Sequence, residues 1–154
     1  MMTESKLTNT PATKLAAIAA QPLQGKNILA VEDDESILAL ITIILERAGA
    51  TVTAVGGADA ALLALQANPH YDLLLSDLAM PDTDGWSLIR QVRALAAESG
   101  GKILAAALTA YNTKKDRDIS LFYGFQILLS KPIEPAMLVA DVVKLLRNHH
   151  PQQV

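Results

Sequence analysis

Short apolar runs alternate with longer segments of helical periodicity from Lys26 onward, and this alternation limits the folds open to the chain. Each run has the length of a strand. In the segments between the runs, hydrophobic residues recur every three or four positions, the spacing of one face of an α-helix. The runs span residues 27–31, 51–55, 72–76, 102–108 and 126–130. The pattern therefore predicts five successive strand–helix units.

The composition of the runs indicates how the strands are arranged. Runs 27–31, 72–76 and 102–108 are apolar without alternation, as expected of parallel strands covered on both faces, whereas "TVTAV" (51–55) alternates with threonine as an edge strand would. The helical segments offer apolar faces that can cover such a sheet, at Ile37, Ile41, Ile44, Leu45, Ala48, Ile89, Val92, Ala96, Leu138, Val142, Leu145 and Leu146. We therefore predict an α/β fold with a five-stranded parallel sheet, (βα)5.

Glycines mark two of the predicted helix ends. Gly49 is placed to end the first helix, and Gly124 to end the fourth, which we expect over 112–123. The second helix is expected over 60–67.

The two ends of the chain differ from its middle. Residues 1–25 are rich in Thr, Ala, Pro and Gln, and only 14–20, "KLAAIAA", suggests a short helix there. We expect a flexible tail or linker over 1–25, one domain over 26–147 and a C-terminal tail over 148–154.

Composition narrows the class of protein. Apolar residues make up 51% of the 154 residues, which is too hydrophobic for a disordered chain, and they are too evenly interrupted for a membrane span. No secretory signal pattern opens the sequence, so we expect a cytoplasmic protein. The absence of cysteine excludes disulfides and thiolate metal sites. With a net charge of −3 and no basic run, neither nucleic acid nor membrane is an expected partner.

Polar side chains follow four of the five runs. Glu32 and Asp33 follow the first run, Asp77 the third, Thr109 the fourth and Lys131 the fifth. Because the carboxyl ends of parallel strands lie at one edge of an open sheet, these side chains should converge there.

The converging residues favour phosphoryl chemistry. Neighbouring carboxylates repel one another unless a cation lies among them, and an all-oxygen ligand set suits Mg²⁺. Lys131 can pair with a phosphoryl oxygen and the Thr109 hydroxyl can donate to another. Asp77 is the candidate nucleophile, since an aspartyl carboxylate can carry a phosphoryl group as an acyl phosphate.

Four blocks, "ILAVEDDE", "SDLAMPDTDGW", "ALTAY" and "LLSKPIEP", resemble the receiver domain of two-component response regulators, over residues 26–147. "LQGKNIL" and "GFQILLSKPIEPAML" look most like receivers of hybrid sensor kinases. The resemblance implies a doubly wound, flavodoxin-like sheet of order 2-1-3-4-5. It also implies a residue-by-residue assignment: Mg²⁺ ligands at Glu32, Asp33, Asp77 and the Ala79 carbonyl, phosphorylation at Asp77, a switch hydroxyl at Thr109, and a phosphate-pairing lysine at Lys131, often joined to Pro132 by a cis peptide.

The implied function is a phosphorylation-dependent signalling switch. A histidine kinase or a histidine phosphotransfer protein would supply the phosphoryl group, and phosphorylation would change affinity for a downstream protein target. Such a domain catalyses only its own phosphorylation and dephosphorylation. The apolar fourth and fifth helices are compatible with a homodimer.

One position departs from the family pattern: Leu128 stands three residues before the lysine, where Tyr or Phe is usual.

Two other functions remain open. A Mg²⁺-dependent phosphohydrolase can also use an aspartyl nucleophile, but it commonly carries a second acid two residues later, where this chain has Ala79. A binding module without phosphotransfer is the second alternative, and Leu128 leaves room for it.

Some of the acidic residues, and the tryptophan, have structural interpretations instead. Asp34 suits a helix N-cap with Glu35 in the first turn. Asp82 and Asp84 suit the turn "MPDTDG", and Trp86 is expected to anchor the third helix by packing.

Overall fold

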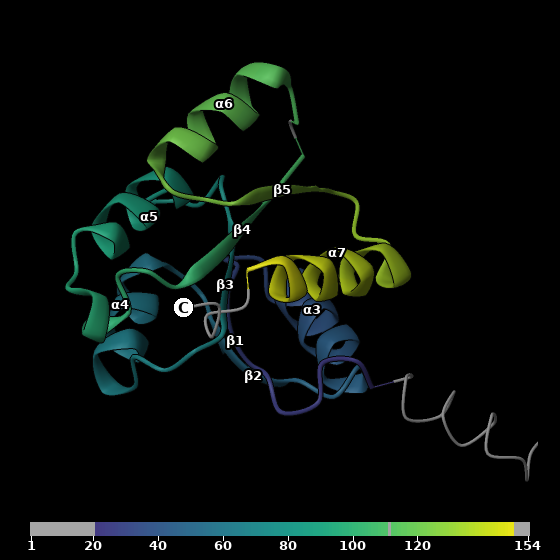
Figure 1. Ribbon diagram of the computed structural model, residues 1–154. Coiled ribbons are helices and arrows are strands. Elements are labelled where there is room, and N and C mark those ends of the chain that lie inside the picture. The colour runs from purple at the N-terminus through teal and green to yellow at the C-terminus, as the bar shows by residue number, and fades with distance from the viewer. Residues whose placement is uncertain (1–20, 111, 150–154) are drawn as a thin grey trace, which may run out of the picture.

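The computed structural model describes residues 21–110 and 112–149. Within them, five strands form one sheet in the order β2-β1-β3-β4-β5, with every neighbouring pair parallel (Figure 1). The predicted sheet and its strand order are confirmed. The strands are β1 (Asn27–Val31), β2 (Thr51–Val55), β3 (Leu73–Asp77), β4 (Leu104–Thr109) and β5 (Ile127–Ser130).

Helices cover both faces of the sheet (Figure 1). On one face lie α3 (Glu35–Arg47) and α7 (Pro135–Asn148), and on the other α4 (Ala58–Ala67), α5 (Gly85–Arg93) and α6 (Lys114–Tyr123). Alternate residues of the central strands point to opposite faces, so the sheet separates two apolar clusters. Both clusters draw on β1, β3 and β4, which explains why these runs are apolar without alternation.

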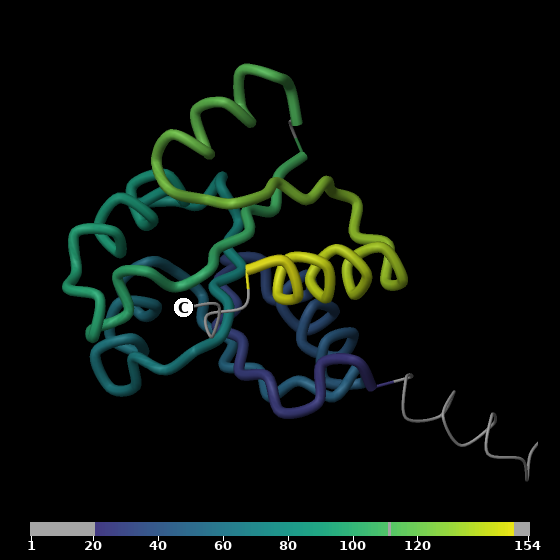
Figure 2. Tube along the Cα trace, in the orientation of Figure 1, coloured from purple at the N-terminus to yellow at the C-terminus, as the bar shows by residue number. Residues whose placement is uncertain are grey.

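Because the strands are parallel, their carboxyl ends all lie at one edge of the sheet. The polar residues that end or follow these strands therefore lie at this edge. Val31 near this edge pairs with Val55 of β2 and Ser76 of β3, and Asp77 pairs with Leu108 of β4. Each strand runs to this edge and returns through a helix, as the trace in Figure 2 shows. The chain therefore brings four separate strand ends together.

Side-chain caps begin four of the described helices, and two of these caps, on α3 and α5, follow the strands that end in the acidic residues. Asp34 accepts a hydrogen bond from the Ile37 backbone N–H at 3.0 Å, which confirms the predicted N-cap of α3. Asp84 accepts from the Ser87 N–H at 2.8 Å and caps α5. Asp82 lies in the preceding turn with φ of 66°.

Two glycines lie just past helix ends, as predicted. Gly49 has φ of 105° and follows the end of α3, and Gly124 has φ of 128° and follows α6. This left-handed backbone region strains residues that carry a Cβ.

The third helix ends earlier than predicted. Ala96 was expected on its buried face, but α5 ends at Arg93, and Ala96 is exposed ahead of a short 3₁₀ helix, η1 (Ala97–Ser99). The Arg93 side chain donates to the Gly101 and Gly124 carbonyl oxygens, and Gly101 N–H donates to Ala96 O at 3.1 Å. These contacts turn the chain away from the helix axis, although its alanines favour helix.

The start of the packed region also differs from the expected boundary. Leu23 falls within the expected tail, 1–25, yet it is only 1% exposed and belongs to the core cluster beneath α3 and α7. Its N–H donates to the Ala48 carbonyl oxygen at 2.8 Å. The helix expected over 14–20 lies outside the described residues. In the part of the chain that the structure describes, no helix is long and apolar enough to cross a lipid bilayer.

Candidate functional site

Three acidic side chains meet at the edge where the strands end. Glu32 follows β1, where its N–H donates to the Val55 carbonyl oxygen at 3.1 Å, and Asp33 comes next in the chain. Asp77 is the last residue of β3, one position further into the strand than predicted. One carboxylate oxygen from each of Glu32, Asp33 and Asp77 lies within 4.8 Å of the other two. Glu32 and Asp77 are buried, whereas Asp33 is exposed.

Burial shapes the ionisation of Glu32. Its side chain is 1% exposed, and loss of hydration raises the pKa of this carboxyl above its ordinary value of 4.5. Hydrogen bonds from Lys131 and from the Asp34 backbone N–H act in the opposite direction, and the nearby Asp77 charge adds to the rise. The carboxylates are thus crowded enough that a further positive charge would stabilise their ionised forms.

Lys131 joins the two buried acids. Its Nζ lies 2.9 Å from Oε1 of Glu32 and 3.1 Å from Oδ1 of Asp77. Burial disfavours the charged ammonium, but the hydrogen bonds and charges of the two carboxylates outweigh it and raise the pKa of Lys131 above 10.5. The peptide bond between Lys131 and Pro132 is cis.

Thr109 ends β4 beside the point where the chain leaves β5 for Lys131. It is the last residue of β4, buried, and pairs in register with Ser130, the residue that precedes the lysine. The Lys131 N–H donates to the Thr109 carbonyl oxygen at 2.9 Å. The two residues predicted to contact a phosphoryl group are therefore joined through their backbones.

Ala79 lies in the loop after β3, close to the candidate nucleophile. Its N–H donates to Oδ1 of Asp77 at 3.3 Å, the same oxygen that accepts from Lys131. The loop therefore holds the Asp77 carboxylate from a second side.

Gly85 is a positioning residue that the sequence reasoning missed. A Cβ at Gly85 would overlap the Asp77 carbonyl oxygen and crowd the Leu78 backbone. Its own N–H donates to the Leu78 carbonyl oxygen at 2.9 Å. The first residue of α5 thus packs directly behind the end of β3. From the sequence alone, the "DG" of "DTDGW" indicates only a turn.

The prediction for Trp86 is confirmed. Its ring packs with the cluster under α5, and its Nε1–H donates to Oγ of buried Ser120 on α6 at 2.8 Å. Tyr123 is also beside it, with ring centroids 6.1 Å apart. Leu128, at the departure from the family pattern, packs against the same cluster.

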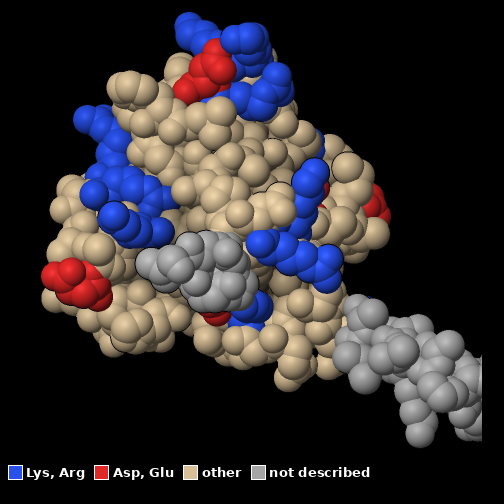
Figure 3. Space-filling view, viewed as in Figure 1, with Lys and Arg blue, Asp and Glu red and all other residues tan. Residues whose placement is uncertain are grey.

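Basic side chains on one face of the molecule form separate groups rather than a continuous stripe (Figure 3). One group lies over α6 with acidic side chains beside it, where Lys114 and Asp118 form an exposed ion pair at 2.9 Å. A continuous basic surface, the usual footprint for nucleic acid, is not seen on the face in view.

The site combines groups suited to one kind of chemistry. The carboxylates of Glu32, Asp33 and Asp77 can act as hard oxygen ligands for a divalent cation such as Mg²⁺. Lys131 offers a positive charge to an anion at the same place. Arranged in this way, a buried carboxylate can accept a phosphoryl group whose charge is neutralised from two sides.

Comparison with known proteins agrees with this arrangement. Residues 28–143 match the family model described as the response regulator receiver domain. The chain is 41% identical over 119 residues to an uncharacterized 14.6 kDa protein of Leptolyngbya boryana, which covers 77% of this chain and 88% of that protein. It is also 36% identical over 135 residues to the sensor histidine kinase GacS of Pseudomonas protegens, which covers 84% of this chain but only 15% of GacS.

A solved structure of the same family shares the fold. It is the receiver domain of the sensor histidine kinase PA1611 from Pseudomonas aeruginosa, described with a magnesium ion coordinated in its active site cleft. The two chains are 32% identical with a TM-score of 0.71, over 80% of this chain and 98% of that one. Together with the strand order and the acidic edge, these matches show that the chain belongs to the response regulator receiver domain family of two-component signalling.

Proposed function

We propose that this domain is a phosphorylation-dependent switch that accepts a phosphoryl group on Asp77 in a Mg²⁺-dependent reaction. The observation that carries the proposal is the position of Lys131 Nζ, within 3.1 Å of Asp77 Oδ1 and 2.9 Å of Glu32 Oε1, beside the three-carboxylate cluster. The donor would be a phosphohistidine on a histidine kinase or a phosphotransfer protein. Because such kinases draw the phosphoryl group from ATP, we place the reaction in the cytoplasm.

The carboxylates of this chain fit the metal. Glu32, Asp33 and Asp77 would supply oxygen ligands, with the Ala79 carbonyl as a fourth protein ligand. Mg²⁺, when bound, would neutralise negative charge on the phosphoryl oxygens during transfer.

The residues of the chain then have distinct roles. A carboxylate oxygen of Asp77 forms the new P–O bond while the P–N bond to the donor imidazole breaks, and the imidazole leaves with the electron pair. Lys131 moves its charge from the free carboxylates to the phosphoryl oxygens. The Thr109 hydroxyl donates to another phosphoryl oxygen and draws the following loop toward the site.

The added charge is the signal. Phosphorylation adds about two negative charges at neutral pH. We infer that this shifts the population between two arrangements of the β4–α6–β5–α7 face, with a coupling of about 1–3 kcal/mol toward a downstream protein target. The domain would act catalytically only on its own phosphorylation and dephosphorylation.

The experiment uses acetyl phosphate and Mg²⁺ as the donor system. Intact-mass spectrometry should show one phosphoryl adduct on the wild type and none on Asp77→Asn. Asp82→Asn is the matched control, since Asp82 is an exposed acid in the same loop with φ of 66°, which Asn tolerates. An adduct that persists in Asp77→Asn would refute the assignment.

Two further observations separate the alternatives. Steady release of phosphate over many turnovers from a small phosphomonoester would favour a phosphohydrolase over a switch. Trp86 fluorescence that stays unchanged across a millimolar Mg²⁺ titration, with no adduct formed, would favour a binding module without phosphotransfer.

A further inference from the structure

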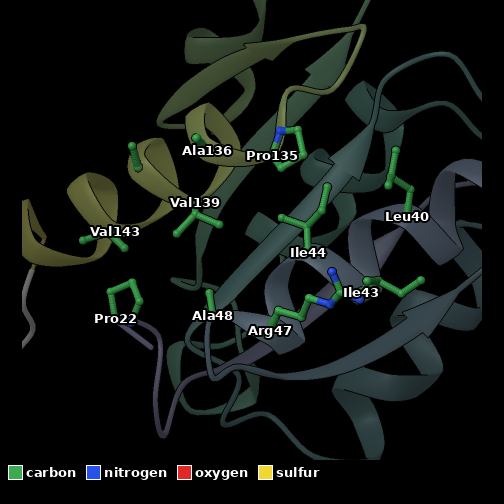
Figure 4. Close-up of a pocket in the computed structure, with 11 residues that line it drawn as sticks. Pro22, Leu40, Ile43, Ile44, Arg47, Ala48, Pro135, Ala136, Val139 and Val143 are labelled. Carbon is green, nitrogen blue, oxygen red and sulfur yellow. The ribbon is translucent and has the colours of Figure 1, made fainter. Parts of the chain in front are cut away.

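An apolar groove of about 660 Å³ runs between α3 and α7 (Figure 4), and none of the described residues of the acidic site lines it. Leu40 and Ile43 line it on the α3 side, and Val139 and Val143 on the α7 side. The two α3 side chains are 42% and 50% exposed respectively, which is high for large aliphatic residues. Among the described residues, Arg47 is the one charged residue in the lining of the groove, and the other lining residues are all apolar. An exposed, mostly apolar surface of this kind marks a place where another segment binds.

The described chain begins at one end of this groove. Pro22 lines the groove near Ala48 and Val143 (Figure 4). The next residue, Leu23, is anchored in the core, and its N–H donates to the Ala48 carbonyl oxygen. The residues before Pro22 are therefore attached directly at the mouth of the groove.

The preceding segment, residues 14–20, has a sequence that suits the groove. It lies outside the described residues and reads "KLAAIAA". As a helix it would place Leu15 and Ile18 on one face, with alanines that allow a second helix to approach closely. Its seven residues would span about 10 Å, and α3 from Leu40 to Ala48 spans about 12 Å.

Attachment favours this segment over any free occupant. Only Gln21 separates it from Pro22, and so short a tether gives an effective concentration of about millimolar or higher. A second copy or another protein would need a comparable concentration to compete.

We propose that residues 14–20 dock as a helix in the groove between α3 and α7, with Leu15 and Ile18 against its aliphatic walls. The segment would run from Pro22 toward Leu40 and cover the exposed side chains of α3. This proposal does not depend on phosphorylation of Asp77.

The test uses paramagnetic relaxation in NMR spectra of the full chain. Because the chain has no cysteine, Ala17→Cys provides a single attachment point for a nitroxide, on the helix face away from Leu15. We expect loss of the amide signals of residues 40–48 and 136–143 relative to the reduced label. A mixed sample combines spin-labelled protein without isotope enrichment and isotope-enriched protein without a nitroxide. In this sample the same signals should be retained, because the proposed contact lies within one chain.

Variants connect the signal loss to the contact. In the spin-labelled protein, the double substitution Leu15→Glu and Ile18→Glu should restore the amide signals of the groove. The control Leu7→Glu places the same kind of change earlier in the chain, and the groove signals should still be absent. Ile43→Glu, at a half-exposed position, should also restore them while the remaining spectrum stays folded.

Three results would overturn the proposal. One is retention of the groove signals in the spin-labelled wild type. The second is signal loss that survives the double substitution. The third is signal loss that also occurs in the mixed sample, which would make a second copy the occupant.

Discussion

The Lys131 ammonium lies 2.9 Å from the Glu32 carboxylate, although 99 residues separate the two in the sequence. In the sheet, β3 and β4 stand between the strands that these residues follow. The contact therefore exists only because parallel strands end at one edge. It joins the predicted metal ligands to the predicted phosphate-binding residue in one charge cluster.

Replacement of Lys131 should make stability more dependent on Mg²⁺. In Lys131→Ala, two buried carboxylates lose their cationic partner, and we expect the free energy of unfolding to fall by about 2 kcal/mol in EDTA. Because the metal and the lysine interact with the same carboxylates, Mg²⁺ should raise the melting temperature of the variant more than that of the wild type.

The matched control for this variant is Lys114→Ala. Its ion pair with Asp118 has both side chains more than half exposed, and such pairs contribute little to stability. Urea unfolding in EDTA gives the free energies of unfolding, and thermal unfolding with and without Mg²⁺ gives the melting temperatures of both variants and the wild type. An equal Mg²⁺ response in Lys131→Ala and the wild type would contradict the shared site.

The pKa shift of Glu32 predicts a pH effect on stability without metal. The pKa of Glu32 is raised in the folded protein above 4.5, so the folded state holds this proton more tightly than the unfolded state does. Its contribution to stability is fully present below pH 4.5 and is lost as the pH rises through the folded-state pKa. Glu32→Gln cannot ionise and should therefore gain stability relative to the wild type as pH rises from 4.5 toward neutrality.

Urea unfolding in EDTA at a series of pH values measures this difference. Glu35→Gln, an exposed acid in the first turn of α3, controls for the removal of one negative charge nearby. The prediction would be wrong if the free energy of unfolding of the wild type rose relative to that of Glu32→Gln as the pH rises. That result would show that the ion pair with Lys131 outweighs the cost of burying the Glu32 carboxylate.

A side chain at position 85 should disturb the site from behind. Gly85→Ala forces a Cβ into the Asp77 carbonyl and the Leu78 backbone, and such overpacking lowers the free energy of unfolding by about 1–3 kcal/mol. The adduct from acetyl phosphate should form more slowly as well, because Asp77 is displaced. Gly56→Ala is the control, since nothing lies within 4 Å of the Cβ it would add. A fully stable and fully active Gly85→Ala would contradict the close packing.

The hydrogen bond between α5 and α6 should be measurable through Trp86. Ser120→Ala leaves the buried end of the indole without its acceptor, which lowers the free energy of unfolding by about 1–2 kcal/mol. The emission of the single tryptophan should shift in the same variant. Exposed Ser99, changed to Ala, should alter neither quantity. An unchanged stability in Ser120→Ala would show that water replaces the hydroxyl.

Most of the fold could be predicted because the buried strands leave a clear pattern. β1 and β3 are covered on both faces, so Ile28–Val31 and Leu73–Leu75 are apolar without alternation. Asp34 and Gly49 mark the ends of α3 by their backbone chemistry. Long-range contacts leave no such local pattern. Alanines around Ala96 favour helix, yet contacts of Arg93 with Gly101 and Gly124 end α5 early.

The residues of the candidate site also fall into those that the sequence predicts and those that it does not. Glu32, Asp77 and Lys131 could be singled out because each follows or ends an apolar run, and parallel topology then requires their convergence. Gly85 could not, because its role depends on the backbone of Asp77 behind it. The polar and prolyl neighbours of Leu23 indicate a tail, and only the packing of α3 and α7 shows that Leu23 is part of the core.

The most direct test of the central claim identifies the residue that carries the phosphoryl group. After reaction with acetyl phosphate and Mg²⁺, borohydride reduces an aspartyl acyl phosphate to homoserine, which peptide mass spectrometry can locate. We predict homoserine at position 77 alone, with its yield reduced in Lys131→Ala. Homoserine at another position, or phosphate that resists borohydride and maps to Thr109, would contradict the account.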